Sequence, residues 1–456
     1  TLVSSKTKFI KQAAQLCHIE DDAEVIRDLV SEIEWAKVNI ISPETYRTSA
    51  QSLERVTASK LSFDQIAQVY ETYLSELDQA NCMDFEDVLL TTTALLANYP
   101  DLAAQVRSQY RYFTVDEFQD VSPIQFELLS LWLGNRDDIC VVGDPAQTIY
   151  EFTGATADYL TKFTEHFPRA EVFELTQSYR STPQIIETAN QVLGAMPGEK
   201  LYLGTQIASA NSVISTSYAD DQTEADDIVN QIATLMAAGT EPRDIAIIFR
   251  MNSQSDIFAQ SLSEAGIPYS LRGTTRYFDR VEVRNALLHL RANLQAEIDR
   301  ELNYQVRDIV SSLGWSPEPP NSGQSAQLTW ESLNTLVELA EEFAKENPNQ
   351  LLADFIAMLD NRNEFDLEPT PNAVTLASIH AVKGLEWEVV FVAGLSEGLV
   401  PISYATTEPT INQERRLFYV ALTRAKHQLH LSWAKSRSAQ TKQHRGPSRF
   451  LLEINR

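Results

Sequence analysis

The chain has few of the residues and patterns that mark secreted, membrane-spanning or zinc-binding proteins. Its 456 residues include only three cysteines, Cys17, Cys82 and Cys140, whose spacing matches no disulfide framework or metal site. No apolar run approaches the roughly 18 residues that a membrane span requires. No signal-peptide pattern opens the chain. We therefore expect a protein of the reducing cytoplasm, without disulfide bonds and without a membrane partner.

The pattern G-x-x-x-x-G-K-[ST] is also absent from the whole sequence. This loop surrounds phosphate groups with backbone N–H groups and a lysine, and its hydroxyl binds Mg²⁺. A chain without it lacks one standard means of holding a nucleoside triphosphate.

Positive charge is scarce as well. The chain has 37 Lys and Arg residues and 63 Asp and Glu residues, which gives a net charge of −26. An overall excess of negative charge affects solubility, but it says little about whether one local groove is basic. The basic residues late in the chain leave two interpretations open, a nucleic-acid groove or a solvated face with a flexible tail. They are Arg415, Arg416, Arg424, Lys426, Lys435, Arg437, Lys442, Arg445 and Arg449.

The composition, 43% hydrophobic and 22% charged, is that of a soluble globular protein. The length predicts roughly two to four domains. Residues 1–82 are predicted to be helical, and Ser62 with Gln65 forms a capping box before one of the helices. Apolar residues that share one face of an earlier helix are Ile26, Leu29, Val30, Ile33 and Ala36.

From residue 83 onward, strands and helices alternate, which predicts parallel sheets in an α/β fold. The predicted strands are 112–115, 138–142, 172–175, 244–250, 373–380, 387–395 and 429–433. Predicted helices include 124–133 and 255–265. We expect two lobes joined near 174–177. The segment 286–371 breaks the alternation and is predicted to be a small helical insertion with a Pro/Ser/Gly linker at 316–327.

The apolar run at 112–115 ends in two acids, Asp116 and Glu117. Ligands of open parallel sheets bind beyond the carboxyl ends of the strands. One carboxylate there can hold the metal that accompanies a nucleotide, and its neighbour can polarise a water molecule. The alternative is a solvated acidic turn, which is common after strands.

The next strand ends at Val142, and the Gly-Asp-Pro turn after it presents Gln147. A glutamine at this place can sense a γ-phosphate by hydrogen bonding. Tyr150 and Phe152 follow, and exposed aromatic rings can stack on bases. The alternative is that both rings pack in the interior.

Two later segments each contain an arginine suited to a transferring phosphoryl group. In QSYRST the arginine is Arg180, which follows Tyr179. The alternative interpretation of Arg180 is a surface residue at the start of a helix. In ERRLFYVALTRAK the residue is Arg424, predicted to lie on a helix with Tyr419 and Thr423. The alternative for Arg424 is a solvated helix residue.

The segment TLASIHAVKGLEWEVVFVAGL has polar residues between two predicted strands. His380, Lys383, Gly384 and Glu386 are predicted to lie in that connecting loop. An ordinary polar connection between strands is the alternative.

In this order the five segments resemble motifs II, III, IV, V and VI of the superfamily 1 DNA helicases of the UvrD/Rep/PcrA type. The resemblance runs from about residue 83 to residue 433, with only the insertion poorly matched. It is closest to the actinobacterial UvrD paralogue with a much reduced second insertion domain, as EIEWAK, FTGA and LSWAKSRS indicate. The implied fold is two RecA-like parallel-sheet lobes, the first incomplete, with helical insertions.

The resemblance implies five domain segments. They are a helical insertion of the first lobe (1–82), the remainder of that lobe (83–174), the first part of the second lobe (175–285), a small helical insertion (286–371) and the second part of the second lobe (372–456).

The resemblance also implies roles in hydrolysis. Asp116 would bind Mg²⁺, Glu117 would activate the attacking water, and Gln147 would couple the γ-phosphate to DNA. Arg180 and Arg424 would be arginine fingers. ATP would lie between the lobes, so that its γ-phosphate decides whether they close.

Other matching residues would bind the nucleotide or the DNA. The implied nucleotide contacts are Tyr179 with adenine, Glu386 with ribose, and Lys383 and Gly384 with the phosphates. The implied contacts with single-stranded DNA are Tyr150, Phe152 and His380. Phe152 and Thr153 depart from the Trp and Arg that are common in the family, and both departures bear on the DNA contacts.

The implied function is that of an ATP-dependent 3′→5′ DNA helicase in repair or replication. Its cofactors would be ATP and Mg²⁺, and its partners single-stranded DNA and duplex junctions. Two alternatives remain open, a DNA-binding scaffold that kept the fold and lost the motor, and a translocase that does not unwind. The missing phosphate-binding loop is expected to precede Thr1, so that this chain alone would be inactive.

Overall fold

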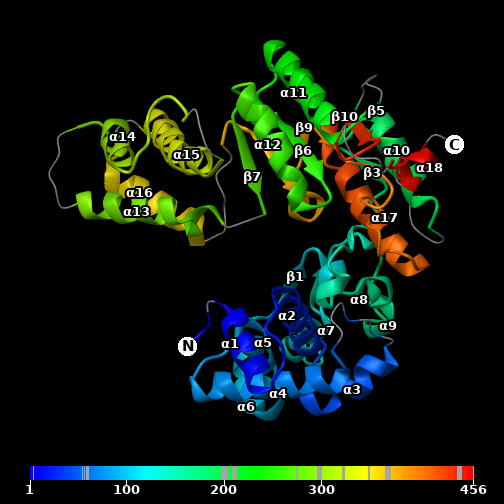
Figure 1. Cartoon of the computed structure of the whole chain (residues 1–456). Helices are drawn as coiled ribbons and strands as arrows, with labels where there is room; N and C mark the ends of the chain where they lie inside the picture. The colour runs from blue at the N-terminus through cyan, green and yellow to red at the C-terminus, as the bar shows by residue number, and fades with distance from the viewer. Residues whose placement is uncertain are drawn as a thin grey trace. The chain divides into compact units, whose positions relative to one another are not determined.

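The computed structural model describes most of the chain as two compact units. The described residues are 1–3, 5–53, 55, 57, 61–196, 204–207, 213–273, 276–294, 300–320, 324–347, 350–364, 371–438 and 444–454. Unit 1 is Thr1–Glu174 and unit 2 is Leu175–Arg456, and the colours of Figure 1 follow the chain through both. The division into five domain segments stays a prediction. Within the described ranges, no helix is long and apolar enough to cross a membrane.

Unit 1 is mainly helical, as its sequence predicts. Its helices are α1 (Lys6–Leu16), α2 (Ala23–Val38), α3 (Pro43–Ser52), α4 (Phe63–Gln79), α5 (Phe85–Asn98), α6 (Pro100–Gln109), α7 (Pro123–Leu133), α8 (Asp158–Thr161) and α9 (Phe163–His166). The predicted capping box starts α4, where Gln65 accepts from the backbone N–H of Ser62. A buried ion pair joins Lys37 of α2 to Asp84, the residue before α5, at 2.7 Å.

A two-stranded parallel sheet carries the acidic segment of unit 1. Strand β1 (Phe113–Val115) pairs with β2 (Ile139–Val141), and α7 connects them. Their carboxyl ends therefore lie at the same edge of the sheet. Short 3₁₀ turns follow at η1 (Phe118–Asp120), η2 (Pro145–Gln147) and η3 (Glu151–Thr153).

The prediction of a strand at 172–175 is wrong. These residues form no strand in the structure, and the apolar side chains of Val172, Phe173 and Leu175 are exposed. Alternating β-branched and aromatic residues favour a strand only where a neighbouring strand pairs with them.

Unit 2 is built on a six-stranded, all-parallel sheet. The strand order is β5 (Ile214–Tyr218), β10 (Ala425–Ala434), β9 (Trp387–Val392), β6 (Ile245–Phe249), β8 (Val374–Ser378) and β7 (Tyr269–Arg272). A separate short pair joins β3 (Gln177–Ser178) to β4 (Gly204–Thr205). The parallel α/β architecture predicted from the alternation is confirmed.

Helices cover both faces of this sheet. They are α10 (Pro183–Leu193), α11 (Asp221–Ala237), α12 (Ser255–Glu264), α17 (Glu408–Leu422) and α18 (Arg449–Ile454). Figure 1 shows α11 and α12 together on one side and α10 and α17 on the other. Ile228 of α11 and Phe258 of α12 share one hydrophobic core with the inner strands. Short 3₁₀ turns lie at η4 (Pro242–Asp244), η5 (Asn252–Gln254), η6 (Tyr277–Asp279) and η7 (Ile379–Val382).

In the described part of the segment between β7 and β8, four helices have a hydrophobic core of their own. They are α13 (Val281–Asn293), α14 (Leu302–Ser312), α15 (Gln324–Glu346) and α16 (Leu352–Glu364). Val306, Leu336 and Phe355 are fully buried in that core. The predicted linker at 316–327 is shorter than expected, because α15 already begins at Gln324; residues 321–323 lie outside the described part of the chain.

Candidate nucleotide and DNA sites

The acids of unit 1 occupy a tight turn directly after β1. Asp116 and Glu117 are both exposed, and the Oδ1 atom of Asp116 accepts a hydrogen bond from the Glu117 N–H at 2.8 Å. Glu117 has φ +51°, in the left-handed region that residues other than glycine seldom adopt. The next residue, Phe118, is fully buried and donates its N–H to the Val142 carbonyl at 2.9 Å. The fold therefore holds Glu117 in a strained, outward-facing conformation.

Hydrogen bonds connect Glu117 to Gln147 through two residues that the site prediction left out. Gln119 donates from Nε2 to Glu117 Oε2 at 2.5 Å and accepts at Oε1 from the Asp144 N–H at 3.0 Å. Asp144 in turn accepts at Oδ2 from Gln147 Nε2 at 2.9 Å. The structure thus brings together the predicted residues after β1 and after β2. The only sequence signal for the connection was a glutamine close to the acids and a glycine before Asp144.

The two aromatic residues after this turn differ in exposure. Phe152 is 54% exposed, whereas Tyr150 is half-buried. Their ring centroids lie 6.3 Å apart with a tilt of 55°. Burial, together with the charges of Asp120 and Glu117, raises the pKa of Tyr150. Interior packing is therefore wrong for Phe152, while its role in DNA binding stays a prediction.

In unit 2, two predicted residues, Arg180 and Glu386, lie within one small cluster. Arg180 Nε contacts Glu386 Oε2 at 2.5 Å, and Lys426 Nζ contacts Glu386 Oε1 at 3.1 Å. Burial pushes the pKa of Glu386 upward, but the Lys426 hydrogen bond and the charge of Arg180 outweigh it and lower that pKa. Tyr179, beside this cluster in sequence, is 74% exposed. Lys426, which the sequence analysis named only among the late basic residues, is a further member of this cluster and lies near the start of β10.

Arg424 lies deep in unit 2 rather than on a solvated helix. Its side chain is 1% exposed, and the helix α17 ends two residues earlier, at Leu422, so the predicted helical position is wrong. The guanidinium donates to the carbonyls of Val420 at 2.9 Å and Leu385 at 3.1 Å, and to Thr423 Oγ1 at 3.1 Å. Arg424 is therefore tied directly to the loop that carries Glu386.

The loop between β8 and β9 carries the remaining predicted residues, as expected. His380 lies in η7, at the carboxyl end of β8, and Gly384 has φ +80°, which suits glycine. Lys383 is half-buried. Burial, reinforced by the positive charge of Arg250, lowers the pKa of His380 to about 4, so the imidazole is neutral at physiological pH.

Many of the late basic residues are paired within unit 2. Arg445 contacts Asp221 at 2.9 Å, and Arg415 and Arg449 pair with glutamates. Pairing of this kind neutralises their charge locally, so these three residues form no open basic groove.

The acids after β1 suit a magnesium ion that is held together with a nucleotide. Among the residues that the structure describes, no group of three or more His, Cys, Asp or Glu side chains is arranged to hold a metal. Mg²⁺ needs no such cage, since one or two carboxylates, waters and substrate phosphates usually hold it. Asp116, an exposed carboxylate at a strand end, fits that kind of site, and its role stays a prediction.

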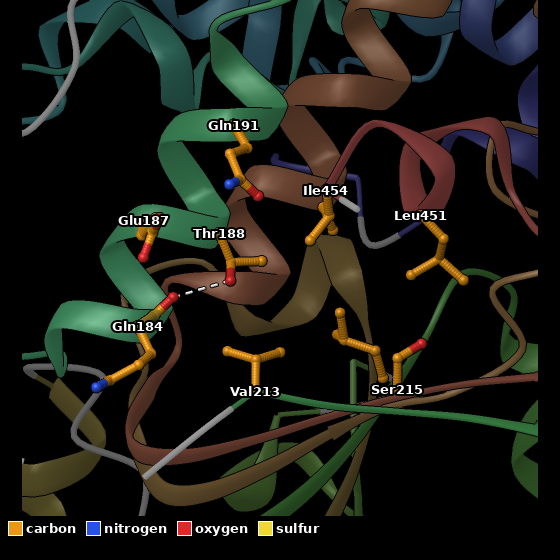
Figure 2. A pocket seen from close by; sticks show the side chains of 9 residues that line it. Gln184, Glu187, Thr188, Gln191, Val213, Ser215, Leu451 and Ile454 are labelled. Carbon is orange, nitrogen blue, oxygen red and sulfur yellow. Dashed lines mark hydrogen bonds between the residues drawn. The ribbon is translucent and has the colours of Figure 1, made fainter. Parts of the chain in front are cut away.

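A pocket of about 250 Å³ lies elsewhere in unit 2, among α10, β5, β10 and α18. Figure 2 shows Thr188 of α10 donating to the Gln184 carbonyl at its edge. None of the predicted site residues is among the side chains that line it. This pocket therefore takes no part in the sites described above.

Comparison with protein-family models decides the family. The UvrD/REP helicase N-terminal domain matches residues 3–168. The UvrD-like helicase C-terminal domain matches residues 173–317 and 292–436. The chain belongs to the UvrD-like helicase family. The family predicted from five ordered motifs is therefore confirmed, while the role of each residue stays a prediction.

Curated members of the UvrD-like family give the same result. The chain is 41% identical to ATP-dependent DNA helicase UvrD2 of Mycobacterium tuberculosis, over 99% of this chain and 66% of the relative. It is 28% identical to UvrD1 of the same species and to PcrA of Staphylococcus aureus, over 85% of this chain and 63% and 64% of those proteins. The chain spans about two thirds of the length of these relatives.

Proposed function

We propose that the full-length gene product carrying these residues is an ATP-dependent DNA helicase that moves 3′→5′ along single-stranded DNA. Membership of the UvrD-like family supports this function. Relatives from two bacterial genera that carry the name ATP-dependent DNA helicase support it too. The direction, the preference for duplex junctions and a role in repair or replication follow from the motif resemblance.

The observation that carries the proposal is the turn at Glu117. A non-glycine residue in the left-handed region costs about 1–3 kcal/mol and persists where the surrounding structure fixes it, which happens most often at functional sites. Here the strained residue is an exposed Glu117 at the carboxyl end of β1, and Gln119 holds one of its carboxylate oxygens. A fixed carboxylate can orient a water molecule and accept its proton.

The neighbouring residues supply complementary chemistry. Asp116 would hold Mg²⁺, which when bound neutralises phosphate charge. Arg180 and Glu386 form an ion pair in unit 2 with side chains 40% and 38% exposed, so Arg180 can exchange its carboxylate partner for a phosphate. Tyr179, 74% exposed, can stack on adenine. Lys383 and Gly384 would lie near the phosphates.

The DNA contacts would come from Phe152, Tyr150 and His380. Phe152 is exposed, and stacking on a base contributes about 1–3 kcal/mol. His380 of unit 2 is neutral at physiological pH, so it would act as a hydrogen-bonding group rather than as a cation.

The test uses the full-length gene product, ATP, and DNA duplexes with a single-stranded 3′ or 5′ tail. We expect strand displacement only from the 3′-tailed duplex. We expect the 456-residue chain alone to hydrolyse ATP poorly, because its sequence has no phosphate-binding loop of the G-x-x-x-x-G-K-[ST] type. Robust DNA-stimulated hydrolysis by this chain alone would contradict the second expectation.

The same experiment separates the alternatives. ATP-dependent release of streptavidin from a biotinylated single strand, without displacement of a duplex strand, identifies a translocase that does not unwind. DNA binding without any hydrolysis identifies a scaffold and overturns the proposal. Displacement from the 5′-tailed duplex contradicts the proposed direction.

A further inference from the structure

Gln119 is a fully buried amide whose two ends are both engaged between the turns that follow β1 and β2. Its side chain is 0% exposed. The Nε2 end donates to Glu117 Oε2 at 2.5 Å, and the Oε1 end accepts from the Asp144 N–H at 3.0 Å. A carboxylate or an apolar side chain cannot make both contacts, because only an amide offers a donor and an acceptor on one short fork.

The path continues to Gln147 through Asp144, whose backbone N–H binds Gln119 and whose carboxylate binds Gln147. Asp144 accepts from the Ala146 N–H at 3.0 Å through Oδ1 and from Gln147 Nε2 at 2.9 Å through Oδ2. Glu117, Gln119, Asp144 and Gln147 therefore form one chain of hydrogen bonds. Such chains reinforce each member and restrict its orientation.

Gly143 makes room for this arrangement. A Cβ atom at this position would lie 2.5 Å from Gln119 Oε1 and 2.8 Å from Leu160 Cδ2. At these distances a side chain at residue 143 would force the Gln119 amide or Leu160 to shift, so the absence of one leaves the amide in place.

The turns themselves do not depend on Gln119 to stay together. Backbone hydrogen bonds already join Phe118 to the Val142 carbonyl and Val142 to the Val115 carbonyl, both at 2.9 Å. A buried amide contributes little net stability and is costly when a partner is missing. The buried amide is therefore better explained by its contact with Glu117 than by stabilisation of the fold.

We propose that Gln119 is a positioning residue that fixes the Glu117 carboxylate and makes its orientation depend on that of Gln147. This inference rests on the proposed function, in which Glu117 activates water and Gln147 senses the γ-phosphate. Through the amide, a movement of Gln147 is transmitted to the carboxylate that orients the water molecule.

The test is the Gln119→Met variant of the full-length gene product, which keeps the volume and removes both hydrogen bonds. We expect kcat for DNA-stimulated ATP hydrolysis to fall on the order of 100-fold, the effect of a misplaced catalytic group. The KM for ATP and the affinity for a fluorescent, non-hydrolysable ATP analogue should stay unchanged, since Gln119 is not expected to touch the nucleotide.

Gln125→Met is the matched control. Gln125 lies six residues away and accepts from the Ser122 N–H at 2.9 Å in the cap of α7, so its loss affects stability without reaching Glu117. We expect this variant to keep kcat. Gly143→Ala, which displaces the same amide, should lower kcat in the same way, and combining it with Gln119→Met should add little.

Two results would overturn the inference. One is an unchanged kcat in Gln119→Met. The other is a fall in kcat that is accompanied by an equal fall in analogue affinity and by a lower urea unfolding midpoint, with the same changes in Gln125→Met. Absence of hydrolysis by the unmodified full-length protein would instead overturn the proposed function and, with it, this inference.

Discussion

Glu224 of α11 is a buried acid, and among the residues that the structure describes no cation forms an ion pair with it. Burial raises the pKa of its carboxyl to about 7, although the Gly394 N–H and the Ser432 hydroxyl both donate to it. Its folded-state pKa therefore lies above the ordinary value of 4.5. The carboxyl favours folding while it is protonated. That contribution is complete below pH 4.5 and is lost as the pH rises through about 7.

Replacing Glu224 with glutamine tests this charge directly, because the amide oxygen can still accept both hydrogen bonds. We expect Glu224→Gln to be more stable than the unmodified chain by about 3 kcal/mol above pH 8, with a smaller gain at pH 5.5. Urea unfolding at the two pH values, followed by a probe in unit 2, measures the difference. A gain that is the same at both pH values would show that the carboxyl is not perturbed.

Single residues illustrate where sequence reasoning succeeds and where it stops. Asp116 and Glu117 were identified because a strand pattern ends at them. Gln119 was not assigned a role, since its importance depends on Asp144 and Gly143, residues about 25 positions away that pack against it. The burial of Arg424 could not be predicted either, because the periodicity of apolar residues does not show where a helix ends relative to a neighbouring loop.

At the scale of elements, strands of the sheet centre were predictable and those at its edges were not. The central strands β6, β8 and β9 are buried along almost their whole length, so they appear as continuous apolar runs. The edge strands β5 and β7 are partly exposed and contain polar residues, and neither was predicted. The opposite error at 172–175 has the same origin, since an apolar run without a pairing partner stays irregular.

Arg424 joins the end of α17 to the loop between β8 and β9. Arg424→Lys removes the guanidinium group that donates hydrogen bonds to Val420, Leu385 and Thr423 at the same time. We expect unit 2 to lose about 1–3 kcal/mol, the cost of leaving a buried carbonyl unpaired. Thermal or urea unfolding of the chain measures this loss.

Arg437→Lys is the matched control, because Arg437 is exposed. It should leave the unfolding midpoint nearly unchanged. An equal midpoint for Arg424→Lys and the unmodified chain would show that the buried guanidinium contributes no stability to that junction.

For the whole molecule, five motifs in order were enough to predict the family that the family models then matched. The parallel sheet of unit 2 followed from the alternation of strands and helices. The hydrogen-bonded path from Glu117 to Gln147 and the cluster of Arg180, Glu386 and Lys426 did not, because both depend on side chains brought together from distant segments. The central claim is that Glu117 activates the water that attacks ATP.

One measurement tests that claim most directly. It compares DNA-stimulated ATP hydrolysis by the full-length gene product with and without Glu117→Gln, and it measures binding of a non-hydrolysable ATP analogue to both proteins. Glu127→Gln, an exposed change on α7, is the matched control. We predict that kcat falls about 10²–10⁴-fold in Glu117→Gln, while analogue affinity is retained and Glu127→Gln behaves like the unmodified protein. An unchanged kcat in Glu117→Gln would contradict the account.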